Sequence, residues 1–321
     1  MKKTISRFNV IVAMVLSLVL ALVSPVTTLA QDDSAEPIHI GVLQYVEHEA
    51  LDAVLKGFED TLNASEFGDR IVWDIQNGNG DQANLQSISE KIARDNDILF
   101  AIATPAAQSL AVVETEKPIF IAAVTDPVEA GLVESLEEPN TNVTGTSDMA
   151  PIAEQVDLLI RNFPDVENVG LIYNSSEVNS VVLVELAVEE LEARGLTTHV
   201  GTVTNTNDIA QVMNSLTSQV EAMFMVTDNT IDSSIALVGD MAKEAGIPTI
   251  GSSDSVVMTN GLATLSNSYE DYGIQTANMV IRMLTEELDP AEMPVELAEN
   301  HQVIVNPDFA EALGIDPESI Q

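Results

Sequence analysis

The sequence predicts an α/β fold made of two doubly wound parallel-sheet lobes. Short apolar runs bounded by turn residues alternate with helical patterns along nearly the whole chain after residue 37. Within 98–127, an apolar run ends at Thr104, a short helical pattern follows, and a second apolar run closes at Asp126. The same arrangement returns between 222 and 254, where the two runs end at Thr227 and Asp254. Uninterrupted apolar runs are typical of strands buried on both faces, and a helix between two of them makes a parallel βαβ unit.

The first half of the chain supplies the elements of one lobe in order. A strand is expected at 38–43, followed by a helix whose apolar residues recur at helical spacing from Leu51 to Leu62. Alternation around Trp73 predicts a second strand at 70–76, and Asp81 is the expected N-cap of the next helix, to Ile92. The 98–127 unit comes next, and 142–148 is expected to be a short strand and a crossing point.

The β–α alternation starts afresh at Pro151, which predicts a second, similar lobe. We expect helices up to 162, at 177–194 and at 209–216, with strands at 169–173 and 196–203. The second core unit follows, then a helix at 269–287, an acidic connection at 289–294, a strand at 303–305 and a small helix after Pro307.

The N-terminus has the pattern of a secretory signal peptide. Lys2, Lys3 and Arg7 precede an apolar stretch at 10–23, and a small-residue cleavage site precedes Gln31. The apolar core is short for a membrane span, so we expect residues 1–30 to be removed and the protein to be exported to the periplasm. The chain has no cysteine, which excludes disulfides, thiol catalysis and a lipid-modified cysteine at the cleavage point.

The charge balance limits the possible partners. The chain has 12 basic and 51 acidic residues, a formal net charge of −39. Nucleic acids and anionic membranes are bound through a basic face, so neither is an expected partner. An acidic surface with few lysines suits a protein exposed to high salt, where screening weakens self-repulsion.

Motifs for catalysis or metal binding are missing from the sequence. The four histidines show no metal-ligand spacing, Asp228 and Asp232 lack the rest of a calcium loop, and no G-x-S-x-G occurs. Gly78-x-Gly80 is an incomplete phosphate motif, and the acidic Asp81 stands where a phosphate would lie. We therefore expect no enzyme activity, no cofactor and no metal.

Candidate ligand-binding residues follow the predicted strands, because ligands of parallel sheets sit beyond the carboxyl ends of strands, near helix N-termini. Thr104 and the first amides of its helix are expected to hold a carboxylate, and Asp126 and Asp254 an ammonium group, with Glu47 and Asp228 as further candidates for the ammonium. Tyr45 and Tyr173 are expected to enclose an apolar side chain. Each of these residues has a structural alternative as a helix cap, turn or rim residue. The full set is Gln44, Tyr45, Glu47, Thr104, Pro105, Ala106, Ala107, Thr125, Asp126, Ser147, Asp148, Tyr173, Asn174, Ser176, Ser180, Thr227, Asp228, Asn229, Ser253 and Asp254.

Several ordered motifs resemble a known family. They are QYVEH at 44–48 with LD at 51–52, NGDQ at 79–82, TPAAQ at 104–108, AVTDP at 123–127 with AGLV at 130–133, VTG at 143–145 with SD at 147–148, YN at 173–174 with SEVNS at 176–180, VTDNT at 226–230 and DSV at 254–256. In these the chain resembles the ABC-transporter substrate-binding proteins related to bacterial tryptophan- and tyrosine-binding proteins, over essentially everything after the leader. The missing lipobox cysteine and the extreme acidity depart from the family pattern.

This resemblance implies the type I periplasmic-binding-protein fold, with two lobes joined by three crossovers and a ligand between them. The lobes are then expected at 37–145 plus 267–292 and at 146–266 plus 293–321. The implied function is the extracytoplasmic component of an ABC importer. It would act as a monomer, close around a small zwitterion (an aromatic amino acid in many relatives) and deliver it to permease and ATPase subunits. The alternatives are a sensor subunit that presents its ligand to a receptor, or a binder of a branched amino acid or a sugar.

Overall fold

Two parallel-type sheets organise the residues that the computed structural model describes, which are 36–298 and 301–321. The predicted signal peptide and its cleavage site lie outside these residues. Residues Pro37–Gln321 form one unit, and both sheets belong to it. The two predicted α/β lobes therefore correspond to two sheets with their covering helices.

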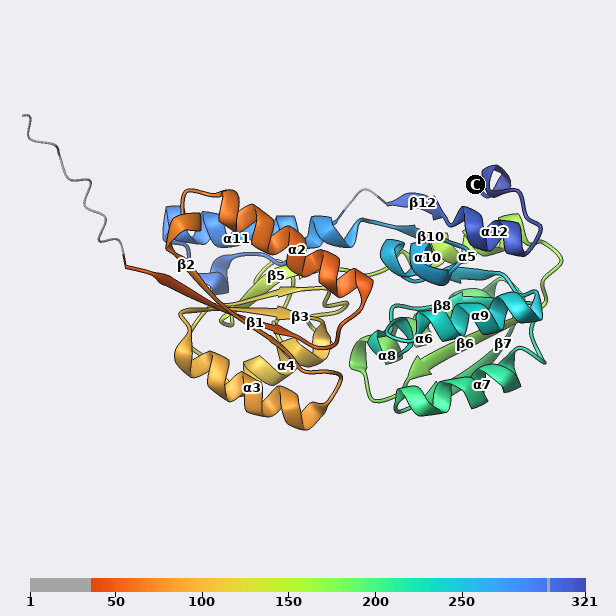
Figure 1. The fold of residues 1–321 in the computed structure, drawn as a ribbon, viewed down its shortest axis with the longest axis horizontal. Helices are drawn as coiled ribbons and strands as arrows, with labels where there is room; N and C mark the ends of the chain where they lie inside the picture. The colour runs from red at the N-terminus through yellow and green to blue at the C-terminus, as the bar shows by residue number, and fades with distance from the viewer. Residues whose placement is uncertain (1–35, 299–300) are drawn as a thin grey trace, which may run out of the picture. The chain divides into compact units, whose positions relative to one another are not determined.

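The first sheet has the strand order β11-β5-β4-β3-β1-β2, with all neighbours parallel. Helices α2 and α11 pack together on one face, and α3 and α4 pack together on the other (Figure 1). The strands are β1 (Ile38–Gln44), β2 (Ile71–Asn77), β3 (Ile98–Ile102), β4 (Ile119–Ala122), β5 (Val143–Ser147) and β11 (Glu296–Leu297). The helices are α2 (Glu49–Ala64), α3 (Gln82–Asp95), α4 (Thr104–Val113) and α11 (Tyr269–Glu286).

The second sheet has the order β12-β10-β9-β8-β6-β7. Its strands are β6 (Asn168–Asn174), β7 (Thr197–Val203), β8 (Ala222–Met225), β9 (Thr249–Gly251), β10 (Ala263–Ser266) and β12 (Gln302–Val305). Its helices are α5 (Ile152–Asn162), α6 (Val178–Ala193), α7 (Ile209–Leu216), α8 (Asn229–Asp232), α9 (Ile235–Ala245), α10 (Asp254–Asn260) and α12 (Pro307–Ala312). Short 3-10 turns occur at Gly68–Arg70, Thr206–Asp208, Pro290–Glu292 and Pro317–Ser319.

The central strands of both sheets are buried along their whole length. Every residue of β3 and β4 is buried, as is every residue of β8 and β9, which confirms the prediction from the apolar runs. The edge strands β2 and β7 are only half-buried. Above the first sheet, the rings of Phe58 and Phe100 stack with centroids 3.8 Å apart, and Trp73 meets Phe58 edge to face. These aromatic contacts fix α2 on the sheet.

Helices α2 and α11 approach each other closely because each has a glycine at the contact. A Cβ atom on Gly57 would lie 2.2 Å from the carbonyl oxygen of Glu270, and one on Gly273 would lie 2.0 Å from that of Val54. Helix α11 follows β10 of the second sheet in the chain but packs on the first sheet. The chain therefore returns to the first lobe after completing most of the second.

Three features differ from the sequence-based expectation. The strand β10 and the helix α10 are short elements that the apolar pattern did not reveal. Strand β12 runs antiparallel to β10, whereas parallel pairing was expected throughout. Strand β11 pairs with the first sheet, although the predicted boundary at 293 assigned it to the second lobe. The remaining lobe boundaries stay a prediction.

Residues 36–298 and 301–321 contain neither a helix suited to span a membrane nor a side-chain cluster suited to hold a metal ion. None of the helices there combines the length and apolar character that a membrane span requires. No group of three or more histidine, aspartate or glutamate side chains there is arranged to hold a metal ion.

Candidate ligand-binding site

The carboxyl ends of strands from both sheets border two adjoining cavities, which share Asn229. The larger has a volume of about 550 Å³, within the usual range for small-molecule sites. It is lined by Tyr45, Val46, Asn79, Gly80, Gln82, Pro105, Gln108, Asn174, Ser176, Glu177, Val178, Thr204, Asn205, Thr206, Asn229, Thr230 and Ser233. The smaller, of about 10 Å³, is lined by His48, Leu51, Ala123, Thr125, Asp148, Asn179, Thr227, Asp228, Asn229, Asp232 and Tyr269.

Backbone strain gathers at these strand ends. Ala103, between β3 and α4, has φ 80 and ψ 153, a region that essentially only glycine adopts. Ala123 follows β4 with φ 54, and Ser252 follows β9 with φ 63. Strain of this kind persists only where the surrounding structure enforces it, and it clusters at functional sites.

Buried polar atoms without a hydrogen-bond partner gather around the smaller cavity. Among the described residues these atoms include His48 Nδ1, Asn179 Oδ1 and Thr227 Oγ1, all from residues that line it. Thr104 Oγ1, at the start of α4, is a fourth. A buried polar atom left unpaired costs about 1–3 kcal/mol, so several in one place indicate a polar ligand.

Three buried carboxylates, those of Asp148, Asp228 and Asp232, also line the smaller cavity. Asp148 accepts hydrogen bonds from Thr125 Oγ1 at 3.2 Å and from Tyr269 Oη at 2.5 Å. Burial raises the pKa of all three carboxyl groups, and the charge of Asp228 raises the pKa of Asp232 further. Within 36–298 and 301–321, no lysine or arginine lines either cavity. A cation from the ligand would supply the missing positive charge.

Glu177 lines the larger cavity and binds Asn229, the residue that both cavities share. Its Oε2 accepts hydrogen bonds from the backbone and side-chain nitrogens of Asn229, and its Oε1 accepts from Thr230 and Asn174. Burial, followed by the charge of Asp228, raises the pKa of Glu177 to about 7. This carboxylate ties the start of α8 to the end of β6, so it positions residues that line the site.

The structure brings many of the predicted site residues together. Tyr45, Pro105, Asn174, Ser176 and Asn229 line the larger cavity, and Thr125, Asp148, Thr227, Asp228 and Asn229 line the smaller. Thr104, Ala106 and Ala107 form the buried first turn of α4. Ser180 is buried next to Asn179, and Ser147 donates a hydrogen bond to the carbonyl oxygen of Thr125. Whether any of them binds a ligand stays a prediction.

Thr104, Ala106, Ala107, Ser147 and Ser180 line neither cavity, and neither do the other six predicted residues. Asp126 accepts hydrogen bonds from the backbone of Val128 and Glu129, and Ser253 caps α10. Asp254 accepts from Ser255 and from the backbone of Tyr269. Gln44 donates to Asp52, Tyr173 packs against the second core, and Glu47 is exposed. For Asp126 and Ser253, and in part for Asp254, these contacts match the structural alternative of a turn or cap.

Sequence reasoning missed His48, Glu177, Asn179, Asp232 and Tyr269. Three of these residues, His48, Glu177 and Asn179, stand inside motifs that carried the family resemblance, so the motifs held a signal that the single-residue arguments did not use. Asp232 and Tyr269 reach the site from the end of α8 and the start of α11. No spacing rule connects such positions.

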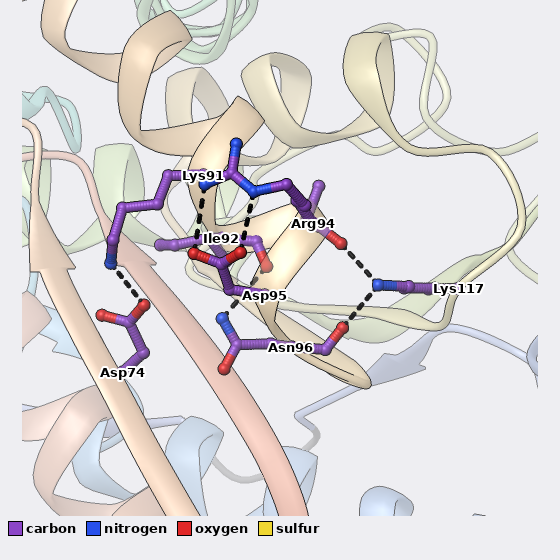
Figure 2. Close-up of polar contacts among 8 residues, drawn as sticks. Asp74, Lys91, Ile92, Arg94, Asp95, Asn96 and Lys117 are labelled. Carbon is purple, nitrogen blue, oxygen red and sulfur yellow. Dashed lines mark hydrogen bonds and ion pairs between the residues drawn. The ribbon is translucent and has the colours of Figure 1, made fainter.

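Basic side chains cluster away from this site, at the C-terminal end of α3. Figure 2 shows Lys117 Nζ donating to the carbonyl oxygens of Ala93 and Asn96, at 2.6 and 2.7 Å. Lys91 pairs with Asp74, and Arg94 pairs with Asp95. This end of the helix faces the amino ends of the strands, opposite the cavities. A ligand carboxylate would therefore have to be held by hydroxyls and backbone amides.

Comparison with known proteins gives a consistent match. The family model of ABC transporter substrate binding proteins matches residues 39–320. A tyrosine-binding protein of Clostridioides difficile (strain R20291) is 36% identical over 284 residues, which cover 88% of this chain and 82% of that protein.

Two solved structures are also similar. The crystal structure of an ABC domain in complex with L-Trp from Streptococcus pneumonia has a TM-score of 0.84 and 36% identity, covering 88% of this chain and 96% of that one. A ligand-free, open substrate-binding protein from Clostridium difficile has a TM-score of 0.67 and 38% identity, covering 87% and 95%.

Proposed function

Because the chain belongs to the family of ABC transporter substrate-binding proteins, we propose that it binds an amino acid between its two lobes and delivers it to an ABC importer. Members of this family are solute-binding proteins rather than enzymes, which confirms the expectation that the chain has no catalytic role. More distant solute-binding proteins share the type I periplasmic-binding-protein fold. The ligands named for two relatives, tyrosine and L-Trp, support an aromatic amino acid.

One observation carries the assignment of the site: unpaired polar atoms and unneutralised carboxylates meet at the same buried place. Asp148, Asp228 and Asp232 there suit the ammonium group of an amino acid. Asp228 was already a candidate for this role from the sequence, whereas Asp126 and Asp254 line neither cavity. A charge-assisted hydrogen bond to such a carboxylate contributes about 1.5–3 kcal/mol. Thr104 Oγ1 at the start of α4 suits the ligand carboxylate. The larger cavity, with Tyr45 on its wall, takes the side chain.

Closure of the lobes around the ligand is the mechanism we propose. The cavity walls combine residues from both sheets, and His48 after β1 approaches Asn229 after β8. The higher TM-score to the L-Trp complex than to the open, ligand-free relative supports a closed arrangement here. A ligand that touches both lobes stabilises the closed state, which the permease then recognises.

Substrate-binding proteins of ABC transporters act outside the cytoplasm, and the sequence pattern of residues 1–30 supports export with cleavage before Gln31. The intact mass of the exported protein tests the cleavage site. A receptor-bound sensor with the same site is the alternative, and co-purification with permease or receptor subunits separates the two.

A thermal-shift screen tests the ligand class. Ligand at one hundred times its dissociation constant adds about 2.7 kcal/mol to the free energy of unfolding, a rise of roughly 5–10 °C for a domain of this size. Tryptophan, tyrosine, phenylalanine, leucine, glutamate and several sugars form the panel. We expect shifts with aromatic amino acids that vanish with tryptamine, which lacks the carboxylate, and with indole-propionate, which lacks the amine. A shift with sugars alone refutes the proposal.

A further inference from the structure

The imidazole of His48 stands where the two sheets meet. Its Nε2 lies 3.5 Å from Asn229 Oδ1. Its Nδ1 is a buried nitrogen without a partner among the described residues, and the side chain lines the smaller cavity. Which of the two nitrogens carries the proton decides whether His48 offers the cavity a donor or an acceptor.

The neighbours of Asn229 settle the direction of its side-chain amide. Asn229 Nδ2 donates to Glu177 Oε2 at 2.6 Å. Glu177 Oε2 accepts from the backbone nitrogen of Asn229 as well as from its Nδ2, so this oxygen is an acceptor whether or not Oε1 carries a proton. An amide that turns its nitrogen to Glu177 turns its oxygen to His48. The contact with Asn229 Oδ1 then requires the proton of His48 on Nε2.

His48 has only one proton to place at neutral pH. Burial lowers the pKa of its imidazole to about 4, and the hydrogen bond to Asn229 and the charge of Asp52 oppose this effect without overcoming it. With the single proton on Nε2, His48 Nδ1 is a bare acceptor.

Asn179 offers a second bare acceptor to the same cavity. Its Nδ2 donates to Ser180 Oγ at 3.2 Å and lies 3.5 Å from the carbonyl oxygen of Thr227. Its Oδ1 is buried and has no partner in the described part of the chain. Carboxylates attract any cation, whereas two neutral acceptors favour an organic cation that carries N–H donors over one that carries none. No group of three or more histidine, aspartate or glutamate side chains of the described residues is arranged for a metal ion.

We propose that His48, held as its Nε2–H tautomer by Asn229 and Glu177, accepts a hydrogen bond at Nδ1 from the ligand's ammonium group, and that His48 and Asn179 select ligands by their N–H donors and not by charge alone. The inference rests on the proposed function. It makes a primary amine the required head group and excludes quaternary ammonium compounds of the same charge.

Nitrogen-15 NMR of the ligand-free protein tests the tautomer without any ligand. We expect the His48 signals of a protonated Nε2 and a bare Nδ1 between pH 6 and 8. The signals are assigned by their loss in His48→Gln. A protonated Nδ1, or a doubly protonated ring in this range, overturns the inference.

Two variants with opposite geometry test the contact with the ligand. His48→Asn places an amide oxygen near the position of Nδ1, whereas His48→Gln places its amide near Nε2. Binding of L-tyrosine and L-tryptophan is measured by calorimetry, after circular dichroism has confirmed that both variants are folded. We expect His48→Gln to lose about 10- to 100-fold in affinity, the range for one hydrogen bond to a charged group, and His48→Asn to lose less. Equal losses in the two variants, or none, refute the inference.

The affinity of the wild type for a series of modified ligands tests the inference even if a variant does not fold. The N-methyl and N,N,N-trimethyl forms of L-tyrosine keep the positive charge and remove donors stepwise. We expect affinity to fall at each step, with a smaller relative loss in folded His48→Gln because the partner of the donor is already missing. Equal binding of tyrosine and its trimethyl form overturns the inference. A wild type that binds no amino acid instead refutes the proposed function, whereas the NMR result decides the tautomer independently.

Discussion

The buried residue Ala103 has a strained backbone conformation next to the candidate site. It has φ 80 and ψ 153 and is buried directly before Thr104. A non-glycine residue in this region costs about 1–3 kcal/mol. This backbone conformation sets the direction in which α4 begins, and it thereby positions Thr104 and Pro105, of which Pro105 lines the larger cavity.

Replacing Ala103 by glycine separates stability from binding. We expect Ala103→Gly to raise the unfolding free energy by about 1 kcal/mol, since relief of the strain exceeds the loss of one buried methyl group. Affinity for the amino acid should fall because Thr104 is held less firmly. Thermal melts and calorimetry of the same variant measure both. A less stable variant with unchanged affinity contradicts this account.

Glu177 gives the protein an unusual pH dependence. Its pKa is raised from 4.5 to about 7, so between these values the folded state keeps a proton that the unfolded state has lost. Stability is therefore fully present below pH 4.5 as far as this group is concerned, and it is lost as pH rises through 7. Asp148, Asp228 and Asp232 have raised pKa values and act in the same direction.

Glu177 contributes on the order of 1–3 kcal/mol between pH 5 and pH 8. The lowered pKa of His48 acts in the opposite direction up to its ordinary value of 6.5 and offsets part of this loss. We therefore expect the melting temperature of the ligand-free protein to fall more, or rise less, over this range than that of Glu177→Gln. Carboxyl groups with lowered pKa values, such as Asp74 and Glu114, change protonation below this window. Glu177→Gln is the matched control, whatever its absolute stability. Parallel pH profiles of the wild type and Glu177→Gln would contradict the assignment.

At the scale of elements, the helix pair α2 and α11 depends on two glycines at its contact. We expect Gly273→Ala to destabilise the protein by about 2–3 kcal/mol, since its Cβ would overlap the backbone of α2. Gly195→Ala is the control: Gly195 has φ +86 and open space around it, so only the backbone conformation costs energy, about 1 kcal/mol. Denaturant melts compare the two. Equal costs would mean that the helices can separate without penalty.

Elements that carry a long, uniform pattern could be predicted from the sequence, and short ones could not. The unit at 98–127 was predictable because β3 and β4 are apolar throughout and flank one amphipathic helix. Strand β10 is four residues long and contains Thr264 and Ser266, so its pattern is too short and too mixed. The antiparallel β12 was missed because strand direction follows from where the chain returns, which local periodicity does not encode.

The site residues can likewise be divided into those that the sequence predicts and those that it does not. Thr104, Thr125, Thr227 and Asp228 directly follow predicted strands, and topology alone puts such residues at one sheet edge. Asn179 lies within α6 and Asp232 at the end of α8, so only the folded positions of those helices bring them to the cavity.

At the scale of the whole molecule, the dominant feature is a net charge of −39. Ion pairs among the described residues, such as those of Lys56 with Asp60 and Glu270, involve exposed side chains and contribute little individually. We expect the melting temperature to rise between low and molar NaCl as screening reduces repulsion. Matched scans in KCl separate screening from binding of a particular cation. Coinciding melts at low and high salt would refute the expectation.

The late position of β11 and β12 has a consequence for biosynthesis. Strand β11 pairs with β5 of the first sheet, and β12 pairs with β10 of the second. A nascent chain emerging from the ribosome therefore cannot complete either sheet until residues 296–305 have been translated. Until then β5 and β10 each present an open edge, and open edges are where chains pair with one another. A premature stop before residue 296 would therefore leave an unpaired, aggregation-prone edge on both sheets, and neither lobe would be complete.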